Sequence, residues 1–226
     1  MRRRELLLAS ATLGLRNSQA ATAITLPRDF GAHPGFRTEW WYVTGALDLP
    51  GVSEPFGFQV TFFRSRTEVP ADHPSAFAAR QIVFAHAALT DPLAQRLRHD
   101  QRIARAGFGI AQASDIDTDL RLRGWTLRRE AGPSGGHRYL TRIDAQGFGL
   151  DFELAATQPV LLQGDAGHSR KGPDAAQSSF YLSEPQLAVR GTLTLDGKRL
   201  AATGRAWLAA RALAGNDMAL AVKEDW

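Results

Sequence analysis

Short stretches in which apolar and polar residues alternate run through most of the chain. In one of them Phe58, Val60 and Phe62 project to one side, whereas Gln59 and Thr61 project to the other. This period of two is typical of β-strands that bury one face and expose the other. The stretches predicted as strands are Thr38–Leu49, Phe56–Arg66, Gln81–Thr90, Leu120–Arg129, His137–Ala145, Phe148–Ala156, Ser179–Ser183, Gln186–Leu195 and Arg199–Trp207.

Turn-forming residues separate these strands. Asp196-Gly197 stands between two apolar stretches and predicts a tight hairpin, because Asp and Gly adopt the positive φ that two-residue turns need. Pro50-Gly51 and Asp144…Gly147 indicate two further reversals of the chain. Consecutive strands joined in this way are expected to pair antiparallel.

Helix is expected to be scarce. The only segments whose pattern permits it are residues 92–114 and the C-terminal tail. Two connections, residues 67–80 and 163–178, are long and polar, and such loops often act as lids or binding loops. Many short strands with little helix predict an all-β fold, either a barrel or a sandwich.

The N-terminal 23 residues have the layout of a signal peptide. Arg2-Arg-Arg4 precedes ten residues without charge, Leu6–Leu15, and Ala21-Thr-Ala23 supplies a cleavage pattern. The adjacent arginines indicate the twin-arginine route. The apolar part is shorter than the roughly 20 residues that span a bilayer, so we expect export to the periplasm and no transmembrane segment.

Composition excludes several classes of protein. The formal charge of +4 includes +3 from residues 1–23, where four arginines oppose one glutamate. The rest of the chain therefore carries a net charge of about +1 and lacks the concentrated basic surface that binds nucleic acid. The absence of cysteine excludes disulfides, thiolate metal sites and a cysteine nucleophile. The six histidines show no local metal-ligand spacing, and no metal or other cofactor is expected.

The segment Glu39-Trp40-Trp41-Tyr42 carries the most chemistry. A strand places Trp40 and Tyr42 on one face and Glu39 and Trp41 on the other. One tryptophan can fill the core while the other lines a cavity or lies under a second domain. Both a purely structural role and an aromatic pocket for an apolar ligand, which a barrel of eight or more strands can enclose, agree with this pattern.

Further motifs accompany this segment in order along residues 30–208. Together they resemble the hydroxyneurosporene synthase (carotenoid 1,2-hydratase) and AttH-type lipocalin-like family. The resemblance implies an antiparallel lipocalin-like β-barrel, the first of two such domains. The matching motifs are His33-Pro34, Glu39–Gly45, Phe56–Arg64, Ala85–Asp91, Pro159–Gly164, Gly167–Lys171, Ser179–Ser183 and Gly204–Leu208.

The resemblance also implies candidate functions. Hydration of an isoprenoid double bond needs an acid that protonates the alkene and aromatic faces that stabilise the carbocation, and it needs no cofactor. Glu39 or Asp91 are candidate acids, and His86 could orient the water. The candidate ligand-binding residues are Trp40, Trp41, Tyr42, Gln59, Arg64, Tyr181 and Trp207.

The end of the chain departs from the family pattern. After Ala206-Trp207-Leu208 the pattern calls for Asp-His-Glu-Trp, but residues 209–226 are alanine-rich and lose the period of two. We interpret 209–226 as an aberrant tail outside the fold, left by a frameshift or truncation. Because the acidic motif is missing, the favoured function is binding of an apolar lipid or isoprenoid-like ligand. The alternatives are a carotenoid 1,2-hydratase-type enzyme and an accessory subunit that binds the permease of an ABC transporter.

Overall fold

The computed structural model describes residues 24–70, 72–132, 135–170 and 178–213, and strands dominate this part of the chain. The strands are β1 (Thr38–Asp48), β2 (Phe56–Arg66), β3 (Gln81–Asp91), β4 (Arg96–Arg105), β5 (Ala111–Ala113), β6 (Asp119–Leu122), β7 (Trp125–Ala131), β8 (His137–Ala145), β9 (Phe148–Ala155), β10 (Leu161–Leu162), β11 (His168–Arg170), β12 (Ser178–Leu195) and β13 (Lys198–Leu213). A single turn of 3-10 helix, η1 (Arg28–Phe30), precedes them.

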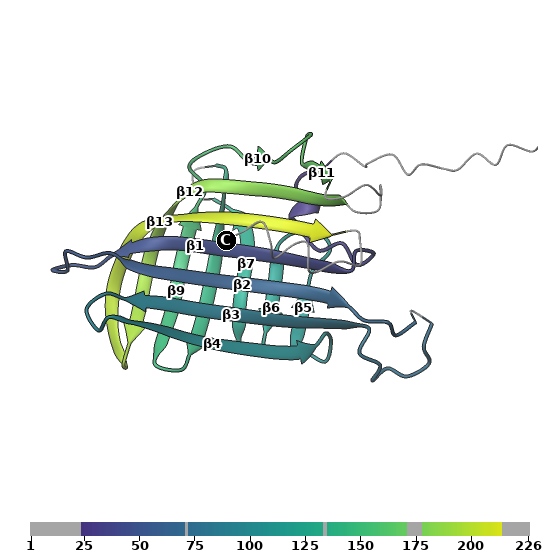
Figure 1. The fold of residues 1–226 in the computed structure, drawn as a ribbon, viewed down its shortest axis with the longest axis horizontal. Helices are drawn as coiled ribbons and strands as arrows, with labels where there is room; N and C mark the ends of the chain where they lie inside the picture. Colours follow the sequence, from purple (N-terminus) through teal and green to yellow (C-terminus); the bar gives the residue numbers. More distant parts are fainter. Residues whose placement is uncertain (1–23, 71, 133–134, 171–177, 214–226) are drawn as a thin grey trace, which may run out of the picture.

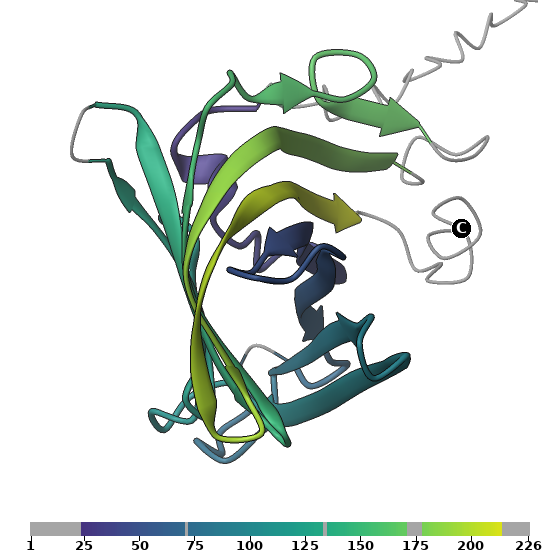
Figure 2. The ribbon, with the colours of Figure 1, turned by 90° about the vertical axis from the view of Figure 1, so that its left-hand side faces the viewer.

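The strands form one curled antiparallel sheet in the order β4-β3-β2-β1-β13-β12-β9-β8-β7-β6-β5, with β10 and β11 paired to β12. In Figure 1, β1 to β4 lie in front of β5 to β9, which run at a steep angle behind them. The turned view in Figure 2 shows how the sheet curls back on itself. The structure is a nearly closed antiparallel barrel, and the predicted all-β fold is confirmed.

The two longest strands join the two layers. β13 pairs with β1 over residues 203–213, whereas β12 pairs with β9 over residues 188–195. Glycines allow close backbone contact where these strands pass from one layer to the other. A Cβ on Gly204 would lie 2.0 Å from the carbonyl oxygen of Ala46, and one on Gly191 would lie 2.1 Å from that of Asp151.

Large apolar side chains from both layers fill the barrel. Trp41, Phe62, Trp125 and Phe152 are buried in one apolar core. Protein interiors pack closely and leave few voids larger than a water molecule. Large side chains thus occupy much of the barrel interior.

Three predicted elements differ from those observed. Residues 92–114 hold β4 and β5 rather than a helix, because β4 is an edge strand whose two faces are both largely polar. The predicted strand 120–129 is a hairpin instead, turned at Arg123 and Gly124, which have φ of 48° and 89°. The two predicted strands within 179–195 are one strand, with an irregularity between Glu184 and Leu187.

The predicted turns agree better with the structure. Asp196 and Gly197 have positive φ, 49° and 80°, and join β12 to β13. Gly51 has a φ of 78° at the reversal after β1, and Gly147 has a φ of 81° between β8 and β9. The predicted signal peptide, residues 1–23, lies outside the described residues. None of the described residues forms a helix long and apolar enough to cross a membrane.

The fold continues past the predicted boundary at Leu208. Residues 209–213 extend β13, pair with β1 and β12, and are buried. The period of two disappears there because both faces of the strand are covered, so its loss does not mark the end of the fold. The interpretation of residues 209–213 as an aberrant tail is thus wrong, and residues 214–226 lie outside the described part.

The role of residues 209–213 can be measured by truncation. A chain that ends at Leu208 should unfold more easily than one that ends at Leu213, by about 3 kcal/mol or more, since it loses ladder hydrogen bonds to two strands. Urea titrations followed by circular dichroism compare the two chains. Equal midpoints would show that this part of β13 contributes nothing to stability.

Candidate functional site

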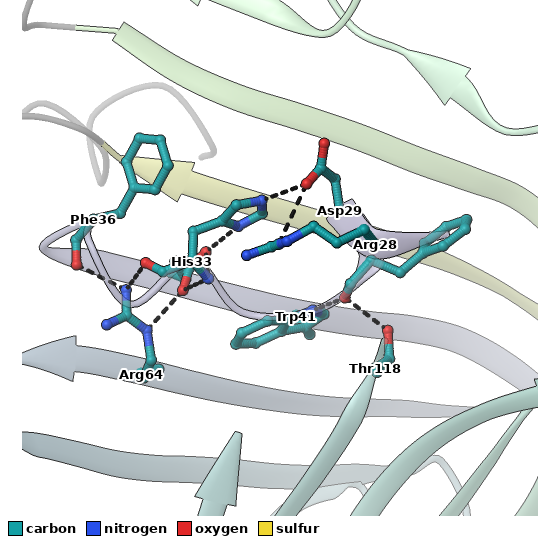
Figure 3. Close-up of polar contacts among 9 residues, drawn as sticks. Arg28, Asp29, His33, Phe36, Trp41, Arg64 and Thr118 are labelled. Carbon is teal, nitrogen blue, oxygen red and sulfur yellow. Dashed lines mark hydrogen bonds and ion pairs between the residues drawn. The ribbon is translucent and has the colours of Figure 1, made fainter. Parts of the chain in front are cut away.

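Glu39 lies at the start of β1 with only 1% of its surface exposed. Its oxygens accept hydrogen bonds from the backbone N–H of His33 at 2.9 and 2.8 Å. Nδ1 of His33 lies 2.6 Å from Oε1, and Nε of Arg64 donates to Oε2 at 2.6 Å. Figure 3 shows His33 and Arg64 on either side of these contacts. Both carboxylate oxygens of Glu39 are therefore occupied by contacts with the protein.

Arg64 joins β2 to the segment before β1. Its side chain is fully buried, and Nη2 donates to the carbonyl oxygens of His33 at 3.0 Å and Phe36 at 2.8 Å. Register explains the pairing, because Glu39 and Arg64 stand directly opposite each other on β1 and β2. Arg64 therefore fixes this segment to β2.

A second set of contacts ties the same segment to the opposite layer. The carbonyl oxygen of Phe30 accepts hydrogen bonds from Nε1 of Trp41 and Oγ1 of Thr118, both at 2.9 Å (Figure 3). Between the segment and β12 and β13 lies a cavity of about 20 Å³, lined in part by His33, Glu39 and Trp41. That volume suits a water molecule and not a lipid.

The charges around His33 favour its protonated form. Burial lowers its pKa, but the hydrogen bond and charge of Glu39 and the hydrogen bond of Asp29 outweigh burial and the opposing charge of Arg28, so the pKa is raised above its ordinary value. Nε2 of His33 lies 3.0 Å from Oδ1 of Asp29. The imidazole thus bridges two carboxylates (Figure 3).

Asp91, the other candidate acid, lies far from Glu39. It stands eight residues along β3 from Val83, the residue that pairs with Arg64, and at about 3.3 Å per residue this separation is roughly 26 Å. Its carboxylate accepts a hydrogen bond from the backbone of Ala94 at 2.9 Å and pairs with Arg98 at 3.3 Å. These contacts hold the turn between β3 and β4, so the structure does not bring the two acids together.

Aromatic side chains gather instead on the outer side of the sheet. In one cross-strand row, Trp40 is paired with Arg211 of β13 and Phe63 of β2, and Phe63 is paired with Phe84 of β3. The Phe63 and Phe84 rings stack with centroids 4.5 Å apart and planes 6° apart, and Trp40 lies 6.5 Å from Phe63. The guanidinium of Arg211 lies 5.4 Å from the rings of both Trp40 and Tyr181. This sheet surface is named the outer aromatic face, and its residues are Trp40, Tyr42, Phe63, Phe84, His86, Tyr181, Trp207 and Arg211.

The candidate residues therefore divide between the two sides of the barrel wall. Glu39 and Trp41 point inward and Trp40 and Tyr42 outward, so the predicted alternation of this segment is confirmed. The inward candidates are Glu39, Trp41, Arg64 and Asp91, and the outward ones are Trp40, Tyr42, Gln59, His86, Tyr181 and Trp207.

His86 is exposed on the outer aromatic face, with its ring 5.6 Å from Phe63 and 6.2 Å from Phe84. Partial burial, and then the charge of His99, lower its pKa below the ordinary value. The neutral ring can therefore accept a hydrogen bond at neutral pH. Such a group can orient water but is a poor proton donor.

Sequence reasoning missed two groups. Phe63 and Phe84 were not among the candidates, although alternation along their strands already placed Phe63 on the same face as Gln59 and Thr61. The second group is Glu184, which lies inside the barrel 2.5 Å from both the hydroxyl of Tyr139 and Nε2 of His137. Burial, and then the charge of Glu184, raise the pKa of Tyr139 well above its usual value.

Glu184 falls between the predicted strands Ser179–Ser183 and Gln186–Leu195, so the sequence pattern gave no signal for it. Its partners come from β8, and the pairing of distant strands is not readable from one sequence. In the described part of the chain, no group of three or more histidines and carboxylates could hold a metal ion.

These features define a lipocalin-like β-barrel with a packed interior and an aromatic outer face. The AttH-like family model matches residues 17–212, and the chain belongs to this family. A crystal structure of an AttH protein from Nitrosomonas europaea is 44% identical, with a TM-score of 0.76 over 88% of this chain and 58% of that one. Kievitone hydratase from Nectria haematococca has a TM-score of 0.59 at 12% identity, over 89% of this chain and 54% of that one, which shows a shared fold.

The chain thus spans little more than half the length of these solved structures. A comparison with curated proteins finds no match. The resemblance found in the sequence motifs is confirmed at the level of the family and the fold.

The Glu39–Arg64 pair should control stability. Replacing Arg64 by Met leaves Glu39 buried without its main partner, and breaking a buried pair costs about 3–5 kcal/mol. Replacing the exposed Arg190, which pairs with Glu153, should cost less than about 1 kcal/mol. Denaturant unfolding measures both, and equal losses would contradict a special role for the buried pair.

The raised pKa of His33 predicts a pH dependence. Its protonation contributes stability that is complete below the unfolded value of about 6.5 and is lost as the pH rises through the higher folded pKa. From about pH 6 to pH 9, the stability advantage of the wild-type protein over His33→Asn should therefore shrink. Unfolding titrations across this range measure the difference, and an advantage that grows with pH would contradict the assignment.

Proposed function

We propose that the outer aromatic face forms one wall of a binding site for an apolar, lipid or isoprenoid-like molecule. The observation that carries this proposal is the aromatic row itself, in which Trp40, Phe63 and Phe84 lie side by side and remain partly exposed. Large contiguous apolar patches on a protein surface often mark binding sites. The opposite wall would come from another domain or protein, because a single sheet face leaves one side of the ligand in water.

Polar groups beside the row suit a ligand with a polar end. Tyr42, Thr61 and His86 form the next cross-strand row. The Tyr42 hydroxyl and the His86 imidazole can donate or accept hydrogen bonds, whereas Thr61 is buried and its Oγ1 accepts one from Nε2 of Gln59 at 3.2 Å. A long apolar molecule with an alcohol at one end matches an aromatic row beside a polar one.

Catalysis is the alternative function. A hydratase of isoprenoid double bonds, as the family resemblance implies, needs an acid beside the aromatic surface. Neither row described above contains a carboxylate. Glu39 points to the other side of the wall and is held by Arg64 and His33. His86 is the one feature that favours this alternative, as a group that orients water, and the acid would have to come from the opposite wall.

The protein is proposed to act in the periplasm. Support comes from the charged, apolar and small-residue regions that follow one another in residues 1–23. Protein recovered from the periplasm is expected to begin near residue 24. N-terminal sequencing of the fractionated protein tests this, and an intact Met1 would contradict it.

Retinol, a neutral isoprenoid alcohol, serves as the probe for binding, because tryptophan fluorescence decreases when retinol binds nearby. Replacing Phe63 or Phe84 by Ser should weaken binding about tenfold, which corresponds to losing about 1.4 kcal/mol of apolar contact. Replacing the exposed Ile116, which lies in the connection between β5 and β6, should leave the affinity unchanged. Equal binding by all these variants would contradict the proposal.

The same titration separates the competing functions. If the face instead contacts the permease of an ABC transporter, purified permease should bind the protein and retinol should not. A hydratase should convert lycopene to a product that contains one added water, detected by mass, and His86→Ala should reduce the rate. Retinol binding without such a product supports the binding function.

A further inference from the structure

A groove of about 500 Å³ lies at one end of the barrel, apart from the outer aromatic face. It is formed by the end of the β2–β3 connection and by the turn between β4 and β5, which lie at the same end of the molecule in Figure 1. Small residues such as Ala78, Ala106 and Ala111 line it, so a flat molecule can approach the backbone closely. None of the residues of the outer aromatic face lines this groove.

An exposed aromatic pair stands beside the groove. The rings of Phe108, which lines it, and Phe77 stack with centroids 5.6 Å apart and planes 8° apart. They are 57% and 73% exposed. Arg105 fixes the pair, since its guanidinium lies 4.1 Å from the Phe108 ring and Nη1 donates to the carbonyl oxygen of Phe77 at 2.7 Å.

The backbone of Phe108 is held in an unfavourable conformation. Its φ is 58°, between Gly107 at 104° and Gly109 at 70°. A bulky residue rarely adopts positive φ, and such outliers gather at functional sites. The turn thus presents an aromatic ring to solvent although neither burial nor local conformation favours that arrangement.

The charged residues that line the groove are Arg80 and Arg121, and no acidic residue lines it in the described part of the chain. Nη2 of Arg80 donates to the carbonyl oxygen of His73 at 2.7 Å, which orients the guanidinium. Arg121 pairs with Asp119 through Nε at 3.0 Å and Nη2 at 2.9 Å, so Nη1 is left to donate elsewhere. Arginine binds planar carboxylates through paired hydrogen bonds.

We propose that this groove binds a small organic carboxylate with a flat apolar body. Arg80 and Arg121 pair with the acid group, and Phe108 covers the body. Asp119 competes with the ligand for Arg121 and sets the affinity. This site is independent of the outer aromatic face and takes an anionic ligand, whereas that face takes a neutral one.

Binding of 2-naphthoate to the full chain, followed by amide NMR, tests the proposal, with 2-naphthylmethanol as the neutral analogue. Naphthoate should shift the amide signals of Gly107, Gly109 and Gln112, and Arg80→Gln should weaken its binding about tenfold while leaving the alcohol unaffected. Phe108→Ala should weaken both ligands. The matched control, Arg205→Gln, replaces an exposed arginine on β13 outside the groove.

A gain of affinity provides a test that misfolding cannot imitate. Asp119→Asn should free Arg121 and tighten naphthoate binding several-fold, with no change for the alcohol. Shifts confined to the outer aromatic face, no shifts at all, or equal affinity for acid and alcohol would overturn the proposal. Retinol should leave the Gly107 and Gly109 signals unchanged, so failure here and failure of the proposed function are distinguishable.

Discussion

The buried ion pair of Glu39 and Arg64 fixes how one end of the barrel is closed. Two charges in a dry interior are tolerated only when their remaining hydrogen-bonding groups also find partners. The backbone of His33 and Phe36 supplies most of these partners, so the segment before β1 lies against the pair, while Nη1 of Arg64 is buried without a hydrogen bond. That position brings the carbonyl oxygen of Phe30 to Trp41 and Thr118 and connects the two layers.

This closure explains why β1 has two different sides. Inward, Glu39 takes part in the ion pair and Trp41 packs in the core. Outward, Trp40 and Tyr42 take no part in the ion pair, and they lie beside aromatic residues of β2, β3 and β12. A single strand therefore separates residues that hold the fold together from residues suited to recognition.

Much of the architecture could be read from alternation and turn residues. The period of two located β1, β2 and β3, and Asp196-Gly197 located the hairpin of β12 and β13. Alternation failed where a strand has the same environment on both faces. β4 is largely polar on both sides and resembled a helix or loop, and residues 209–213 are buried on both sides and resembled a tail.

The sequence by itself determined the family, the all-β class and the two-sided character of the Glu39–Tyr42 segment, because these depend on local order along the chain. It also named most residues of the outer aromatic face. Only the tertiary structure decided that Glu39 pairs with Arg64, that Asp91 lies far from it, and that Arg80, Phe108 and Arg121 line one groove. The physical reason is that partnership between distant strands depends on register and curvature, which local patterns do not encode.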